Sequence, residues 1–481
     1  MGYQPRVFDV AVLGSGLGGL IAAAFLTKES RNVLLLKESK YQPEYIKNGY
    51  RFVPFSNFSE KLISPTIIQK LSQTLDISFS IDDHERSEKS KQEVTFQIIL
   101  PNARIDLFKQ DFLFQRELKR EFPKESVQIK NFYEEMGQMY HSLKELKIRK
   151  EVEFFFPIHP RSLVKKFFLF PFLPKEKMGE KLSSFSNKFR EFIKLQMISL
   201  GNLHPDSFPI SLAPYLLFDD ERVTNIDLEI MAKSIFGKFL LAGGRVEEIE
   251  ELEKVEIVRR KEFLLSLKGE GKTYRSKCLI LNSPLHGLST LLGNHKKYLS
   301  KWEKKIKPLY VMIPLCLGIR DKVIPIGMRD LLVSILDLEN PYGNGNVLFL
   351  SLSTKGDEIQ APEGKRALTV ESLMDLGKWD RTLLANHQKE VMKHLYYLFP
   401  FLENHIEFID FQWTNAQMPK ISYPHFMYET NPDFQWREGI VPAQISKGLY
   451  FTGKENFPYL GLEGEVFSGL MVGRKILQKS H

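Results

Sequence analysis

Short apolar runs separated by glycine turns open the chain. Val10–Leu13 is a run of β-branched and aliphatic residues, and a second apolar run covers Val33–Leu36. The stretch from Phe8 to Glu38 therefore predicts a strand, a glycine turn, a helix and a second strand. This order is that of a βαβ unit in a parallel sheet.

The middle of the chain carries helical and hairpin patterns. Ser64-Pro65 before apolar residues at helical spacing predicts a helix with a capping serine and a proline at its first position. Val94–Leu100 and Arg104–Phe108, joined by a Pro-Asn-Ala turn, predict a β-hairpin. Ser126–Leu146 has apolar residues at helical spacing. We interpret it as a core-packing helix and not as a methionine cofactor site.

Strand-like runs return in the second half. Ile226–Leu241 predicts a helix that ends at Gly243-Gly244. The apolar runs that follow indicate that the chain returns to the first sheet after an excursion. These runs are Val255–Val258, Phe263–Leu267 and Cys278–Leu281. The elements expected in a second excursion are strands at Val311–Gly318 and Asn346–Leu352 and a helix over Trp379–Phe399.

Glycines after the first run have the G-x-G-x-x-G spacing of dinucleotide-binding loops. Gly14 allows the tight turn out of the strand, Gly16 lets the backbone approach a pyrophosphate, and Gly19 lets the helix pack closely on the sheet. Gly18 adds a further glycine to the same turn. The phosphates would lie at the helix N-terminus, where unpaired N–H groups and the helix dipole favour negative charge.

An acidic residue stands where such a site needs one. Glu38 ends the second apolar run, close to the offset of roughly 20 residues at which an acid meets the ribose hydroxyls. A carboxylate there would repel a 2′-phosphate, so the site suits FAD or NAD better than NADP. The alternative is that Val10–Leu26, with Ser15 as its only hydroxyl residue, is a signal peptide or a membrane span. The glycines, the second strand and the acid favour the βαβ unit.

Composition places the chain among globular proteins. Its 481 residues allow two or three domains, or one nucleotide-binding domain with a large insertion. Hydrophobic residues make up 43% and charged residues 26%, which excludes a disordered chain. Cys278 and Cys316 are far apart and match no ligand spacing, so neither a disulfide framework nor a metal site is expected. We expect a cytoplasmic protein.

One segment concentrates basic and aromatic residues. The formal net charge is +8, and residues 161–194 hold nine basic and three acidic residues. Within them, Phe167–Leu173 is an apolar run flanked by lysines and too short to span a bilayer. Such a wedge suits peripheral contact with an anionic membrane, and a lid packed on the protein is the alternative. No nucleic-acid motif accompanies the basic residues, so nucleic acid is not an expected partner.

The end of the sequence repeats the design of its start. Gly448–Gly453 predicts a strand with a glycine at its end, and a loop and a helix with Gly461 and Gly464 near its N-terminus follow. The helix start near Gly464 would face the pyrimidine edge of a flavin, where negative charge gathers on reduction. The alternative is a helix that only packs on the sheet.

Together these motifs resemble those of the phytoene desaturase, carotenoid isomerase and amine oxidase superfamily. There a GLYFTGD-type strand and a GxGIxGA-type loop close an FAD site, and Gly448–Gly453 and the loop before Gly464 are similar to them. The resemblance extends to Gly49–Phe52 and to Gly243–Val246, after which Leu252 takes the position near the adenine. It implies a Rossmann-like α/β FAD-binding domain of the GR2 type, assembled from discontinuous segments, with an inserted α+β substrate domain.

The implied organisation alternates between two domains. The FAD-binding domain is expected at residues 1–85, 226–290 and 436–481. The substrate domain is expected at residues 86–225, which include a lid, and at residues 291–435. The candidate cofactor-binding residues are Gly14, Gly16, Gly18, Gly19, Glu38, Leu252, Gly453, Lys454, Glu463 and Gly464.

Several positions depart from the superfamily pattern. The G-G-R after the ribose acid, whose arginine approaches the pyrophosphate, is absent, and Lys40 or Lys47 would substitute only as point charges. Thr224-Asn225 stands in place of a glycine pair. Lys454 takes the position of an acid that binds the ribityl or phosphate region. Glu463 would lower the flavin potential if it faced the ring, unless Lys454 offset it.

The resemblance implies an FAD-dependent oxidoreductase of the desaturase or isomerase type. Its flavin N5 would accept a hydride from a long apolar substrate, or lend electrons for isomerisation. The 37 phenylalanines favour an apolar tunnel. No residue matches a catalytic motif, so the catalytic residues are unknown at this stage. The rival is a non-catalytic binding protein with a degenerate flavin site, as in the Rab GDP-dissociation inhibitors.

Overall fold

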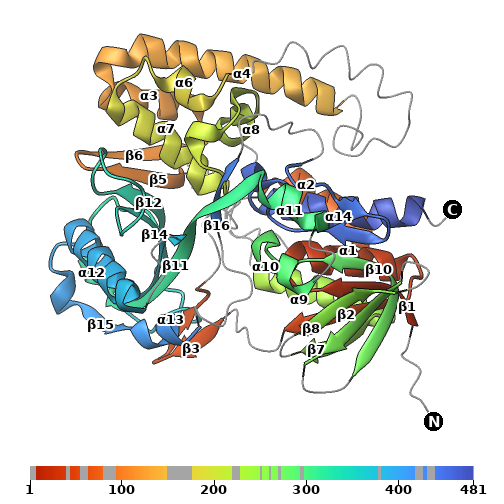
Figure 1. Ribbon diagram of the computed structural model, residues 1–481. Coiled ribbons are helices and arrows are strands. Elements are labelled where there is room, and N and C mark those ends of the chain that lie inside the picture. Colours follow the sequence, from red (N-terminus) through yellow and green to blue (C-terminus); the bar gives the residue numbers. More distant parts are fainter. Residues whose placement is uncertain are drawn as a thin grey trace.

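In the residues that it describes, the computed structural model contains two eight-stranded sheets, a small hairpin sheet and a layer of helices (Figure 1). The described residues are 7–38, 44–54, 63–79, 94–148, 176–218, 228–249, 252–258, 262–268, 272–292, 297–376, 381–417, 426–430 and 439–479. The aromatic run Phe167–Leu173 and the pair Thr224-Asn225 lie outside them.

The first sheet is built from three separated stretches of the chain. Its strands are β1 (Val7–Leu13), β2 (Val33–Glu38), β7 (Arg245–Ile249), β8 (Leu252–Ile257), β9 (Phe263–Leu267), β10 (Thr273–Leu281), β17 (Gln444–Ser446) and β18 (Leu449–Phe451). The order is β17-β18-β10-β1-β2-β7, and β9 and β8 extend the sheet from β10. The pairs from β18 to β7 are parallel. Strands far apart in the sequence thus become neighbours.

Helices α1 (Leu17–Lys28), α9 (Leu228–Leu241) and α14 (Leu462–Gln478) pack on the first sheet (Figure 1). α1 contacts both α9 and α14, and its residues from Gly18 to Thr27 are all buried. This burial explains why the segment is apolar all round and lacks the polar face of a surface helix. In the described part of the chain, no helix is long and apolar enough to cross a membrane.

The second sheet is mostly antiparallel. Its strands are β5 (Val94–Leu100), β6 (Ala103–Phe108), β11 (Ile306–Arg320), β12 (Leu331–Ile335), β13 (Val347–Leu352), β14 (Lys365–Asp375), β15 (Ile406–Ile409) and β16 (Phe426–Thr430). The order is β15-β11-β14-β13-β12-β5-β6, and β16 also pairs with β11. β11 is longer than the predicted Val311–Gly318 because it pairs with β14 from Tyr310 to Arg320 and with β16 and β15 at its two ends.

The remaining helices cover the second sheet and the junction between the sheets. They are α2 (Pro65–Leu75), α3 (Asp111–Glu121), α4 (Ser126–Ile148), α6 (Met178–Leu182), α7 (Asn187–Leu200), α8 (Ala213–Leu217), α10 (Leu285–Leu291), α11 (Lys297–Glu303), α12 (Arg381–Leu398) and α13 (Phe411–Gln417). Figure 1 shows α3, α4, α6, α7 and α8 as a layer above β5 and β6. The small hairpin sheet consists of β3 (Tyr45–Lys47) and β4 (Tyr50–Phe52).

Two local expectations need correction. Ser64 precedes α2 as predicted, but its side chain makes no capping hydrogen bond, and its N–H group is used instead. In α4 the central Phe132 and Met136 are buried, as expected of a core helix, whereas Val127 is 74% exposed because it stands in the first turn.

A parallel sheet assembled from separated stretches and a second, mostly antiparallel sheet confirm the predicted α/β fold class. Strands of the first sheet come from residues 7–38, 245–281 and 444–451. The domain boundaries given above stay predictions.

Two buried histidines of α12 predict acid sensitivity. His387 Nε2 lies 2.7 Å from Ser372 Oγ, and His394 Nε2 lies 2.9 Å from Ser334 Oγ. Burial lowers the pKa of each histidine from 6.5 to about 4. Between these values the unfolded chain binds protons that the folded chain does not, so stability falls as the pH falls below about 6.5.

From pH 7.5 to pH 5 we expect each histidine to contribute a loss of about 2 kcal/mol in the free energy of unfolding. Urea unfolding at the two pH values measures it. The double variant His387→Gln with His394→Gln should lose clearly less of its free energy of unfolding between pH 7.5 and pH 5. An equal loss in the parent and the variant would show that the two histidines do not cause the acid sensitivity.

Candidate cofactor site

Parallel strands of the first sheet end at one edge. β1 ends at Leu13, β10 at Leu281 and β18 at Phe451, and the Thr452 N–H donates to Leu281 O at 2.9 Å. The chain leaves β1 toward β2 on one side, whereas β10 and β18 lie on the other side. Ligands of open α/β sheets bind beyond the carboxyl ends of the strands at such a change in strand order. The gap between the ends of β1 and β10 is therefore the candidate site.

The glycine turn after β1 opens toward this edge. Gly14 has a φ of +102°, in the region that favours glycine, and its N–H donates to Leu36 O at 3.0 Å. Gly16 is the N-cap of α1, and no side chain in the described part of the chain caps this helix. The first turn of α1 also holds no acidic residue. The helix N-terminus is thus suited to an anion such as a pyrophosphate.

Gly18 and Gly19 lie where other chain segments leave no room for a side chain. A Cβ at Gly18 would be 2.6 Å from Thr452 Oγ1, and a Cβ at Gly19 would be 2.5 Å from Asn282 Oδ1. Both distances are too short for a carbon. The first turn of α1 is therefore in direct contact with the loops after β10 and β18.

The loop after β18 has its own hydrogen-bond network. The Gly453 N–H donates to Asn456 Oδ1 at 2.8 Å and to Ser468 Oγ at 3.1 Å. Thr452 Oγ1 also bonds Ser468 Oγ. Lys454 Nζ lies 3.7 Å from Glu465 Oε1. Because Ser468 and Glu465 belong to α14, the loop and the helix that follows it form one unit.

The start of α14 is shaped by glycines and a buried acid. Gly461 has a φ of +56°, and a Cβ at Gly464 would lie 2.5 Å from Phe457 O. Glu463 is 5% exposed, and its Oε1 accepts the Ser64 N–H at 2.8 Å. This carboxylate oxygen is thus turned to the start of α2, and the backbone there offsets part of its charge.

A second buried carboxylate joins three segments beside Gly453. Glu455 is 3% exposed, and its Oε1 accepts the Tyr428 hydroxyl at 2.8 Å and the Leu285 N–H at 3.1 Å. Burial raises the pKa of the Glu455 carboxyl, while the Tyr428 hydroxyl acts in the opposite direction. Glu455 thereby connects β16 and α10 to the loop after β18.

The remaining candidates are placed less completely. Glu38 ends β2 at the same edge, and Leu252 begins β8. The structure describes the backbone of both residues but not their side chains. Lys47 does not serve as a stand-in for the missing arginine, because its Nζ binds Asp410 Oδ1 at 2.9 Å and lies over the Phe408 ring. Lys40, the other substitute considered, lies outside the described residues.

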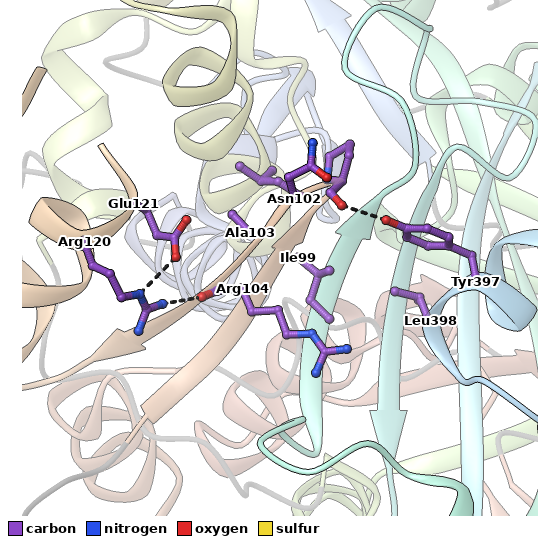
Figure 2. A pocket seen from close by; sticks show the side chains of 10 residues that line it. Ile99, Asn102, Ala103, Arg104, Arg120, Glu121, Tyr397 and Leu398 are labelled. Atoms are coloured by element: carbon purple, nitrogen blue, oxygen red, sulfur yellow. Dashed lines mark hydrogen bonds and ion pairs between the residues drawn. The ribbon is translucent and has the colours of Figure 1, made fainter. Parts of the chain in front are cut away.

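A hollow of about 480 Å³ lies elsewhere, between the turn from β5 to β6, the end of α3 and the end of α12 (Figure 2). There Arg120 donates to Arg104 O at 2.7 Å and pairs with Glu121 at 3.0 Å. Tyr397 donates to Pro101 O at 2.7 Å. These polar groups bind one another, and the hollow shares no residue with the edge where the glycine loops meet.

The sequence analysis did not identify several residues that lie at or support the edge of the first sheet where the glycine loops meet. They are Ser64, Asn282, Thr452, Glu455, Asn456 and Ser468. Asn282 and Thr452 gave one usable signal, since each directly follows an apolar strand, where ligand-binding residues of parallel sheets gather. The others act through partners remote in the sequence and gave none.

Comparisons with known proteins agree with this geometry. No family model matches the sequence. A chloroplastic prolycopene isomerase of Arabidopsis thaliana is 23% identical over 518 residues, covering 98% of this chain and 82% of the relative. A putrescine oxidase triple mutant, redesigned in its cofactor binding, has the same fold with a TM-score of 0.63 and 13% identity, covering 99% of this chain and 100% of that one. The chain is thus similar over nearly its whole length to prolycopene isomerases and shares its fold with FAD-dependent amine oxidases.

The superfamily fold alone does not decide between catalysis and binding. A Rab GDP-dissociation inhibitor of Plasmodium falciparum also shares it, with a TM-score of 0.52 and 12% identity over 98% of each chain. The similarity to prolycopene isomerases, which extends over nearly the whole chain, favours the enzyme. The same similarities suggest a flavin as the cofactor.

Proposed function

We propose that this protein is an FAD-dependent oxidoreductase of the desaturase or isomerase type. The observation that carries the proposal is the contact of Gly18 with Thr452, which joins the first turn of α1, directly after the glycine loop of β1, to the loop after β18. One loop ends at an uncapped helix N-terminus and the other leads into the glycine-bearing start of α14. An extended cofactor with a phosphate centre and a charge-accepting ring needs both ends.

The residues at the edge fit FAD in named roles. The turn from Gly14 to Gly16 and the N–H groups of α1 would hold the pyrophosphate, and Glu38 the ribose hydroxyls. Leu252 would lie near the adenine, and Gly464 and Gly453 near the flavin end. The bound flavin would supply a hydride acceptor, or transient electrons for isomerisation.

Charge balance at the flavin end supports this fit. Three glutamates lie in or beside the loop after β18, and each has a partner. Glu463 accepts from the Ser64 N–H, Glu455 accepts from the Tyr428 hydroxyl, and Glu465 forms an ion pair with the Lys454 ammonium at 3.7 Å. Carboxylates that accept hydrogen bonds or pair with a cation repel added negative charge less than free ones. Lys454 thus compensates the negative charge of Glu465. In the superfamily the position of Lys454 holds an acid and the position of Glu465 holds a neutral residue.

We propose a long apolar substrate, of the polyene or lipid-like class. The similarity to proteins named prolycopene isomerases and the 37 phenylalanines support it. With such a substrate the protein mainly orients the reacting carbons and excludes water.

Flavin content tests the proposal. We expect the purified protein, after incubation with FAD and removal of the free cofactor, to retain about one flavin per chain, measured by absorbance and by release on denaturation. Repeated absence of bound flavin would favour the non-catalytic binding protein. Incubation of the loaded protein with geometric isomers of an apolar polyene, followed by chromatography, then tests the reaction class.

We also propose peripheral contact with an anionic membrane through Phe167–Leu173, supported by the lysines that flank this run. Replacing Phe167, Phe168 and Phe170 with serine is expected to release the protein from liposomes that contain anionic lipid, measured by co-sedimentation. Neutral liposomes are the control. Equal sedimentation of parent and variant would favour a lid that packs on the protein.

A further inference from the structure

Asn282 lies at the gap between the ends of β1 and β10, directly after β10. It is 4% exposed, although it belongs to a polar residue type. Its N–H donates to Leu13 O at 2.8 Å, and its Nδ2 donates to Thr452 O at 2.9 Å. One residue therefore holds the end of β1 and the end of β18.

The side chain of Asn282 fills the space beside the glycine turn. The three atoms nearest to a Cβ built at Gly16 all belong to this side chain, with Oδ1 at 2.8 Å and Cγ and Nδ2 at 3.5 Å. A Cβ at Gly19 would be 2.5 Å from Oδ1 and 2.8 Å from the Asn282 Cβ. Oδ1 itself is buried and has no hydrogen-bond partner in the described residues. The side-chain amide is thus held in place by the hydrogen bond from its Nδ2 to Thr452 O, against the cost of an unpaired acceptor.

The backbone at Gly16 does not itself require glycine. Its φ of −60° and ψ of 160° are extended values that other residues adopt readily. The absence of a side chain at Gly16 therefore has two possible causes, namely a pyrophosphate that approaches the backbone or the Asn282 amide that already occupies the space.

We propose that Asn282 is a positioning residue of the nucleotide site. Its side chain packs into the space left by Gly16 and Gly19 and fixes the loops after β1 and β18 relative to each other. The role in cofactor binding rests on the proposed function, whereas the packing of Asn282 against Gly16 holds without cofactor. Asn282 shapes the site before FAD arrives, which reduces the cost of ordering the loops on binding.

A double-mutant cycle on the apoprotein tests the packing. Gly16→Ala is expected to lower the urea midpoint of unfolding in the parent and to leave it nearly unchanged in the Asn282→Ala background, where the clashing amide is gone. An equal drop in both backgrounds, or no drop in the parent, would overturn the packing role.

The chain offers two matched controls. Gly18→Ala clashes with Thr452 Oγ1, so Asn282→Ala should not relieve it. The clash caused by Gly19→Ala should be relieved by Asn282→Gly but not by Asn282→Ala. Asn282→Ala keeps the Cβ of residue 282, which lies 2.8 Å from a Cβ at residue 19. If Asn282→Ala also removed the drop in urea midpoint caused by Gly18→Ala, the fold would be loosened in general. That result would overturn the specific packing of Asn282 against Gly16.

Cofactor affinity tests the positioning. We expect Asn282→Ala to raise the FAD dissociation constant at least tenfold, measured by flavin fluorescence, in an apoprotein that still unfolds cooperatively. Asn282→Asp keeps the shape but cannot donate to Thr452 O, so it should raise the constant as well, whereas Ser283→Ala next to it should not. An unchanged constant in both Asn282 variants would overturn the role. A parent protein that binds no FAD would contradict the proposed function instead, and the apoprotein cycle would still report on Asn282.

Discussion

The substitution Gly469→Val is expected to abolish flavin binding. It should also lower the free energy of unfolding by about 2–3 kcal/mol, which is the range of costs for overpacking a tight core. A Cβ at Gly469 would lie 2.5 Å from Gly18 O and 3.0 Å from Ile21 Cβ. The nearest of these is a backbone atom of α1, so relief requires α1 and α14 to separate. Their separation would displace the turn that begins the nucleotide site. Urea unfolding and flavin fluorescence measure the two effects.

Gly237 provides the matched control for this substitution. It also lies inside a helix, α9, but apart from the backbone of that helix a Cβ there would meet no atom of the described residues within 4 Å. Gly237→Ala is therefore expected to leave flavin binding intact and to stabilise the protein by up to about 1 kcal/mol through helix propensity. If Gly237→Ala and Gly469→Val lowered stability equally, the close crossing of α1 and α14 would not be the cause.

The second large effect is expected at Glu455. Alanine there leaves the buried Tyr428 hydroxyl and the Leu285 N–H without their acceptor. Each unsatisfied buried donor costs about 1–3 kcal/mol, so we expect a total loss of about 2–6 kcal/mol in the free energy of unfolding. The loop after β18 would lose its link to β16 and α10, and flavin affinity should fall with it. Denaturant unfolding and a flavin titration measure both.

The substitution Glu455→Gln separates the effect of losing the hydrogen-bond acceptor from the effect of losing the charge. Glu455→Gln keeps the volume and an oxygen acceptor, so its loss should be much smaller than that of alanine. Burial raises the pKa of Glu455 above 4.5 in the folded state, so the folded chain holds this proton more tightly than the unfolded chain. Stability from this group is therefore present at low pH and lost as the pH rises through the folded-state pKa.

The stability of Glu455→Gln relative to the parent should accordingly increase between pH 4 and pH 7. Unfolding curves of both proteins at each pH measure this, and the histidines of α12 cancel in the comparison. A difference that stays constant with pH would show that the pKa of Glu455 is the same in the folded and unfolded chains.

Local patterns were enough to predict the first half of the candidate site. The spacing of Gly14, Gly16 and Gly19 after an apolar run predicted a strand, a turn and a helix, and these elements are present. This prediction works because the turn, the helix start and the following strand are all encoded within about thirty neighbouring residues. The strand and helix around Gly453 and Gly464 were recognisable for the same reason.

Contacts between remote segments could not be predicted in this way. Asn282 meets the glycine turn only because β1 pairs with β10 in a register that places Leu13 beside Leu281. Glu463 was considered as a group that faces the flavin, but its carboxylate oxygen binds the Ser64 N–H, 399 residues away in the sequence. Neither the register nor this pairing leaves a pattern in the local sequence, because both depend on how complete elements pack.

The crossing of α1 and α14 also joins an element that is synthesised early to one that is synthesised later. In the sequence, α14 follows α1 and the described strands of both sheets, and its surface, including Gly469, covers part of α1. Until α14 is made, that part of α1 stays exposed, and exposed apolar surface makes a nascent chain prone to aggregation. The loop after β18 lies just before α14 in the sequence. A nucleotide site at this edge can therefore be completed only after both ends of it have been synthesised.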